Sequence, residues 1–167
     1  MMKREAVFSK DLQKRTITVV REFAAPLPLV WRAWTDGSIL DDWWAPKPWK
    51  AETKSMDFKA GGSWLYFMKG PDGNGTWCRV DFNSVQPQKS FSSSAIFCDE
   101  AGNRNMEFPT MDWQVGFNES SGVTTVNVEI HFAKEADMQM IITMGFEQGF
   151  TMGLGNLDEY LAARVPA

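Results

Sequence analysis

The apolar positions near the C-terminus predict one long amphipathic helix from about residue 137 to residue 163. Large apolar residues recur there at steps of three and four, the spacing of one helical face: Phe146, Phe150, Leu154, Leu157 and Leu161. A helix of about 27 residues is ~40 Å long, which is enough to cross a whole sheet. We therefore expect this helix to pack across a sheet with its apolar stripe facing inward.

Three glycines lie beside that stripe. Gly145, Gly149 and Gly153 repeat at intervals of four and would line up on one strip of the helix. Each glycine costs a helix interior ~1 kcal/mol relative to alanine, so three in register need a reason. Close backbone approach to a sheet is one reason, and space for a ligand is the other. Met152 and Asn156 lie near the strip and are candidate ligand contacts with it.

The remainder of the chain alternates mainly with the period of strands. A strand rich in β-branched residues is predicted at 16–23, and two short helices follow, the first after Pro26 and the second at 38–43 with Asp36 as its cap. Runs of period two, separated by turn residues, then predict six strands: 49–56, 63–68, 76–85, 90–98, 110–118 and 123–132. Their short connections indicate an antiparallel meander.

This order of elements predicts an α+β fold in which a curved antiparallel sheet of about seven strands wraps around the C-terminal helix. Two short helices complete it. A length of 167 residues suits one domain. We assign residues 1–15 to an N-terminal extension, residues 16–163 to the domain and residues 164–167 to a tail.

Composition narrows the classes of partner. The formal net charge is -4 and no run of basic residues occurs, which argues against nucleic acid. The polar N-terminus argues against a secretory signal, and the lack of a long apolar run argues against a membrane span. Cys78 and Cys98 lie in strand-like stretches without metal-ligand spacing, so we expect buried free thiols and a cytoplasmic location. Eight Trp, twelve Phe and ten Met residues favour a lipophilic cavity.

Residues suited to catalysis are few. His131 is the only histidine, and the alternation of its strand predicts that it faces solvent. No nucleophile motif, zinc-ligand set or phosphate-binding motif accompanies it. The sequence therefore predicts no catalytic residue, no metal site and no cofactor.

Candidate ligand contacts come from the meander. Trp64, Tyr66 and Met68 share one face of their strand, Trp113 lies on an alternating strand with Met111 and Val115, and Trp44 lies at the mouth beside the short helices. Ordinary core packing is the alternative for each. Arg79 and Asp81 share a face with Trp77, opposite Cys78, Val80 and Phe82. Pointing inward they would anchor a polar head group; pointing outward they form a solvated face, and the sequence leaves both open.

Several short segments, in this order, carry a family resemblance: REFAAP at 21–26, VWRAWT at 30–35, WWAP at 43–46, Asp57 with Gly61 and Gly62, and Gly149 and Phe150 with Leu157 and Leu161. Together they resemble the START or SRPBCC superfamily of helix-grip proteins, and within it the family named after the activator of the ninety-kilodalton heat-shock-protein ATPase. Ala45 and Phe150 depart from the family's usual Gly and Trp. The resemblance implies a cavity between sheet and C-terminal helix, used in the superfamily for lipids, hormones, polyketides or aromatic compounds.

Three hypotheses for function follow from the resemblance and the residues. The first is non-enzymatic binding of a small lipophilic or aromatic ligand in the cavity. The second is a co-chaperone-like action on a heat-shock ATPase, although the chain leaves no room for a separate chaperone-binding domain. The third is a polyketide cyclase or dehydratase in which an inward carboxylate moves protons. A carboxylate in the cavity would distinguish the third hypothesis from the first.

Overall fold

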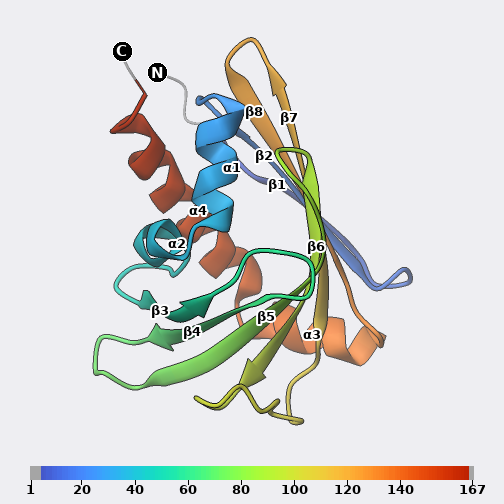
Figure 1. Cartoon of the computed structure of the whole chain (residues 1–167). Coiled ribbons are helices and arrows are strands. Elements are labelled where there is room, and N and C mark those ends of the chain that lie inside the picture. The colour runs from blue at the N-terminus through green and yellow to red at the C-terminus, as the bar shows by residue number, and fades with distance from the viewer. Residues whose placement is uncertain (1–4, 166–167) are drawn as a thin grey trace.

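The computed structural model describes residues 5–165, in which eight strands and four helices form an α+β fold (Figure 1). Along the chain these are β1 (Val7–Asp11), β2 (Thr16–Phe23), α1 (Leu27–Thr35), α2 (Gly37–Trp43), β3 (Lys50–Met56), β4 (Ser63–Lys69), β5 (Gly75–Gln86), β6 (Ser90–Cys98), β7 (Met111–Ser120), β8 (Val123–His131), α3 (Glu135–Thr143) and α4 (Phe146–Ala162). The helix-grip prediction is confirmed, since one curved sheet holds α1, α2 and α4 against its inner face.

All eight strands belong to one antiparallel sheet in the order β1-β2-β8-β7-β6-β5-β4-β3. The strand that the sequence did not predict is β1, which pairs with β2 from Val7 opposite Val20 to Asp11 opposite Thr16. Part of the predicted extension therefore belongs to the sheet. An edge strand with exposed polar side chains lacks the alternation that marks a half-buried strand. Residues 1–4 of the extension and 166–167 of the tail lie outside the described residues.

The two short helices begin and end as their sequence dictates. Pro26 is the N-cap of α1 and Pro28 lies in its first turn, where a missing N–H is tolerated. Asp36 caps α2 by accepting a 3.0 Å hydrogen bond from the Ser38 amide. The Ser38 hydroxyl also donates to this carboxylate, and that hydrogen bond is the main reason that the pKa of Asp36 is lowered.

The prediction of one long C-terminal helix is wrong. The chain forms α3 and then α4, because Gly145 between them adopts a left-handed conformation with φ of +91°. A left-handed residue ends an α-helix, and glycine is the residue that adopts this conformation without steric cost. Figure 1 shows the two helices running in different directions. The apolar stripe still packs as expected, since its members from Phe150 to Leu161 are buried on α4.

One ion pair links α4 to the inner face of β2. Arg21 of β2 points to the inner face, is only 4% exposed and pairs with Asp158 of α4. Its guanidinium lies 4.8 Å from the ring centroid of Phe23. Within residues 5–165 we find no helix with the length and apolar character that crossing a membrane requires.

Candidate functional site

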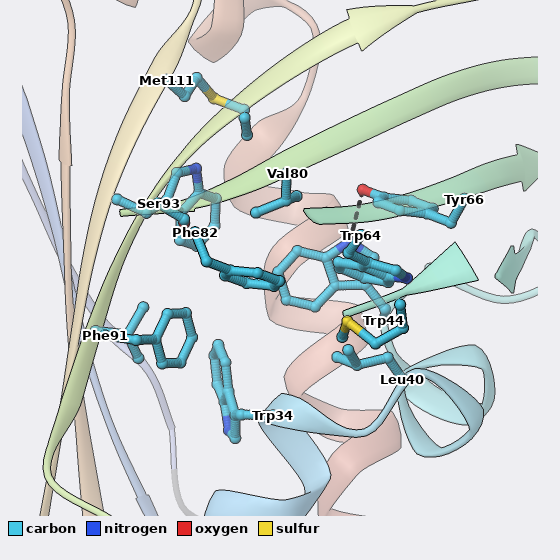
Figure 2. Close-up of a pocket in the computed structure, with 14 residues that line it drawn as sticks. Trp34, Leu40, Trp44, Trp64, Tyr66, Val80, Phe82, Phe91, Ser93 and Met111 are labelled. Carbon is cyan, nitrogen blue, oxygen red and sulfur yellow. Dashed lines mark hydrogen bonds between the residues drawn. The ribbon is translucent and has the colours of Figure 1, made fainter. Parts of the chain in front are cut away.

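A small cavity of about 70 Å³ lies between the inner face of the sheet and the two short helices (Figure 2). Its wall comes from α1, the C-terminal half of α2 and strands β3 to β7, and it is mostly aromatic or aliphatic. The lining residues are Trp34, Leu40, Trp44, Met56, Trp64, Tyr66, Val80, Phe82, Phe91, Ser93, Ala95, Met111, Trp113 and Val115. The family resemblance implied a cavity between the sheet and the C-terminal helix. The observed cavity lies elsewhere, because none of its lining residues belongs to α4.

Trp44 belongs to this wall and lies just after the last residue of α2. Its indole N–H donates a 2.9 Å hydrogen bond to the Tyr66 hydroxyl, drawn in Figure 2. Its ring contacts those of Trp64, Trp113 and Phe150 at centroid distances of 5.6, 5.9 and 6.0 Å. Aromatic pairs of this kind each contribute about 0.5–1.5 kcal/mol beyond area burial, so the cluster holds Trp44 in place.

A chain of hydrogen bonds orients Trp64, the other large ring of this wall. Its indole N–H donates to the Thr53 hydroxyl at 2.9 Å, and that hydroxyl donates to the Asp41 carboxylate at 2.6 Å. The Trp64 ring stacks on Tyr66 with 4.0 Å between centroids. Strands β3 and β4 are thereby fixed to α2 around the cavity.

The cavity wall is neutral at physiological pH. Burial raises the pKa of Tyr66 well above its usual value, and burial raises the pKa of its cross-strand neighbour Cys78 to about 12. Both groups are therefore protonated near pH 7. None of the lining residues is Asp, Glu, His, Lys or Arg. Such a wall favours an apolar, uncharged occupant, because an unpaired charge would be desolvated at high cost.

Four of the predicted contact residues line the cavity: Trp44, Trp64, Tyr66 and Trp113. Met68 lies two residues beyond Tyr66 on the same face of β4 and packs against the core without reaching the cavity. Strand periodicity places Trp64 and Tyr66 of β4 and Trp113 of β7 on the inner face, whereas Trp44 reaches the cavity from the end of α2. Their role in ligand binding stays a prediction.

The register of β5 decides between the two faces that the sequence left open for Arg79 and Asp81. Cys78, Val80 and Phe82 are the residues of this strand that point inward, so the two charged side chains lie on the outer face. There they pair with each other at 3.0 Å, and Arg79 also donates to the Gly102 carbonyl. They therefore do not anchor a ligand in this cavity.

The candidates on and before α4 also lie outside the cavity wall. Gly145 forms the break before α4, and Met152 is 49% exposed. A Cβ at Gly149 would meet only Pro46, at 3.8 Å. Asn156 has a structural contact: its side-chain amide donates to the backbone carbonyl of Ala45 at 3.0 Å.

Gly153 explains part of the predicted glycine strip. A Cβ there would lie 3.0 Å from the Trp44 carbonyl oxygen and 3.3 Å from that of Trp43. The close backbone approach is therefore real, but its partner is the end of α2 rather than the sheet.

Ten of the fourteen lining residues were not among the predicted ligand contacts. Phe91, Ser93 and Ala95 alternate along β6 and all face the cavity, but the serines around them obscure the apolar pattern. Trp34 and Leu40 come from the short helices, whose orientation on the sheet depends on tertiary packing. The alternation within β6 was the available signal for its three residues.

Comparison with known families now identifies the chain. The family described as "Activator of Hsp90 ATPase homolog 1-like protein" matches residues 24–162. The chain belongs to this family. That match covers the whole of the cavity wall and all four helices, and it agrees with the START or SRPBCC type of fold.

Solved structures of similar proteins share the fold over nearly the whole chain. The crystal structure of protein Ms6760 from Mycobacterium smegmatis is 29% identical, covers 96% of this chain and 99% of its own, and has a TM-score of 0.87. A solution NMR structure of a protein from Arthrobacter aurescens is 28% identical, covers 96% and 92%, and has a TM-score of 0.89. No match was found among curated proteins. Folds of this type commonly bind hydrophobic ligands.

Proposed function

We propose that this protein binds a small lipophilic or aromatic ligand in the cavity between the sheet and the two short helices. The observation that carries the proposal is the wall itself, which is rich in aromatic side chains and lacks any charged group. Ligand sites in proteins are typically concave, mostly apolar and equipped with few polar atoms. Here those polar atoms are the Tyr66 and Ser93 hydroxyls and the indole N–H groups.

The size of the cavity limits the ligand. A volume of about 70 Å³ is below the range of roughly 300–1,000 Å³ typical of ligand pockets and is about half of the ~150 Å³ cavity known to accept benzene. A ligand with one ring therefore requires side chains to move. Met56 and Met111 are half-buried lining residues, and flexible methionines adapt readily to new contacts. Figure 2 shows Met111 at one end of the cavity.

Filling the cavity tests the proposal. Ala95 is half-buried in the wall, between its cross-strand partners Val80 and Met111. Ala95→Leu adds the bulk of an isopropyl group and should abolish binding of toluene, which we would measure by ligand-observed NMR and by the shift in Tm. The variant's own Tm should stay within a few degrees of the wild type, because the new carbons occupy existing space.

Ala162→Leu is the matched control, since it makes the same chemical change at an exposed position on α4. It should leave toluene binding unchanged. Failure of the wild type to bind toluene or any comparable apolar compound would contradict the proposed function. Unchanged binding by a folded Ala95→Leu variant would place the ligand elsewhere.

The family description favours one alternative, a co-chaperone-like action on a heat-shock ATPase. Such an action would use the outer surface, so Ala95→Leu should not affect it. Measuring ATP hydrolysis by an Hsp90 chaperone with and without this protein distinguishes the two. A cyclase or dehydratase of the type considered above has less support, because no carboxylate lies among the described lining residues.

A further inference from the structure

The cavity wall contains buried hydrogen-bond donors that have no acceptor. Trp113 is 6% exposed and Trp34 is 4% exposed, and within residues 5–165 neither indole nitrogen has a hydrogen-bond partner. A buried N–H without an acceptor destabilises the fold, so natural structures contain few of them. Both residues line the same small cavity, so an occupant of that cavity is a candidate source of an acceptor.

The other indole groups of the wall are satisfied by the protein. Trp44 donates to Tyr66 and Trp64 donates to Thr53, both at 2.9 Å. The surplus of donors is therefore confined to Trp34, which comes from α1, and Trp113, which comes from β7.

Ser93 is the polar lining residue paired with Trp113. It lies directly opposite Trp113 in the β6–β7 ladder, both residues line the cavity, and Ser93 is only 3% exposed. Cross-strand neighbours have Cβ atoms roughly 4.5–5.5 Å apart, so the two side chains leave the sheet at the same part of the wall.

We infer that the ligand carries a neutral acceptor oxygen, as in a ketone, ester or quinone, and that the Trp113 indole N–H donates a hydrogen bond to it beside Ser93. The inference rests on the proposed function and names its ligand class. A carboxylate is disfavoured because no cation lines the cavity to compensate its buried charge. A pure hydrocarbon would leave the indole N–H unpaired. A neutral carbonyl compound satisfies both conditions.

The test uses acetophenone and α-methylstyrene, which have nearly the same planar shape and differ in C=O against C=CH₂. Titrations monitored by ¹H–¹⁵N NMR spectra of the indole groups give the Kd of each compound and the chemical shift of each indole proton. We expect acetophenone to bind about two- to tenfold more tightly, the effect of one neutral hydrogen bond. The Trp113 indole proton should move downfield with acetophenone and not with α-methylstyrene.

Trp113→Phe keeps a large ring and removes the donor, so it should bind both compounds with equal affinity. Trp77→Phe is the matched control, because it makes the same chemical change on the outer face of β5, away from the cavity wall, and it should preserve the preference for acetophenone. Should Trp113→Phe fail to fold, the indole proton shift in the wild type decides.

The outcomes separate this inference from the proposed function. Equal affinities for the two compounds, with no shift at Trp113, would leave ligand binding intact and overturn the inference. A preference that survives Trp113→Phe and disappears in Trp34→Phe would overturn the assignment to Trp113. If toluene binds and neither of these compounds does, the proposed function stands and the inference is overturned. If none of the three binds, the proposed function fails, and this inference fails with it.

Discussion

Burial sets the protonation of Cys78, a thiol on the inner face of β5 that lies opposite Tyr66 in β4. The pKa of this thiol is raised to about 12, chiefly by desolvation, and the pKa of Tyr66 is raised for the same main reason. The sequence predicted two buried free thiols at Cys78 and Cys98, and both are confirmed. A thiol with such a raised pKa is a poor nucleophile at neutral pH.

The raised pKa of Cys78 makes stability depend on pH above its unfolded value of about 8.5. Below that pH the thiol is protonated in both states and contributes no pH dependence. Between about 8.5 and 12 the unfolded state ionises first, so the stability of the fold falls as pH rises. Urea unfolding at pH 8 and pH 10 should show that wild type loses about 1–2 kcal/mol more than Cys78→Ala. Parallel losses in the two proteins would contradict this assignment.

Whether a site residue could be predicted depended on its neighbours in the strand. Trp113 was placed correctly at the cavity because Asp112 and Gln114 on either side are polar and fix its face. Arg79 and Asp81 were ambiguous because an aromatic residue, Trp77, shares their face. That ring packs outside against Phe67 with 5.1 Å between centroids, a contact across β4 and β5 that no single-strand pattern reveals.

Among the elements, those with strong periodicity were predicted well, and the unpredicted features depend on backbone conformation. Strand β6 matches its predicted bounds, and the Asp36 cap of α2 is confirmed. The break at Gly145 was missed because the apolar stripe that predicted the helix begins at Phe146, so its spacing does not show where the helix starts. Spacing alone aligned Gly145 with Gly149 and Gly153, although only Gly153 makes a close backbone contact.

Two glycines of α4 should respond to alanine with opposite signs. A Cβ at Gly155 meets nothing within 4 Å, so Gly155→Ala should stabilise the fold by up to about 1 kcal/mol through helix propensity. A Cβ at Gly153 would press on the Trp44 carbonyl at 3.0 Å, so Gly153→Ala should destabilise it by roughly 1–3 kcal/mol. Urea midpoints of the two variants provide the measurement. Equal stabilisation by both would mean that α4 can shift away from α2 without cost.

At the scale of the whole molecule, α4 packs on the inner face of the sheet through its apolar stripe. The strand order sets β1 and β2 at one edge and β3 and β4 at the other. The wall of the cavity belongs to the β3–β7 side, while α4 is tied to the β2 side through Arg21. The Arg21–Asp158 ion pair therefore affects how α4 packs on the sheet. Neither of its residues lines the cavity, so a substitution in the cavity wall leaves the ion pair in place.

Removing the carboxylate partner of Arg21 should be costly. Asp158→Ala leaves a guanidinium that is only 4% exposed without its counter-charge. We expect a loss of roughly 3 kcal/mol, the lower end of the range for a broken buried pair, because Asp158 itself is 34% exposed. Denaturant unfolding monitored by tryptophan fluorescence measures it.

The next residue supplies the control. Glu159 pairs with Lys47 at 3.4 Å, but both side chains are largely exposed, so Glu159→Ala should change stability by no more than about 0.5 kcal/mol. Adding Arg21→Met to Asp158→Ala should recover most of the loss, because the buried unpaired charge is then gone. Similar losses of unfolding free energy for Asp158→Ala and Glu159→Ala would show that burying Arg21 does not require the Asp158 carboxylate. In that case the apolar stripe from Phe150 to Leu161 alone would hold α4 on the sheet.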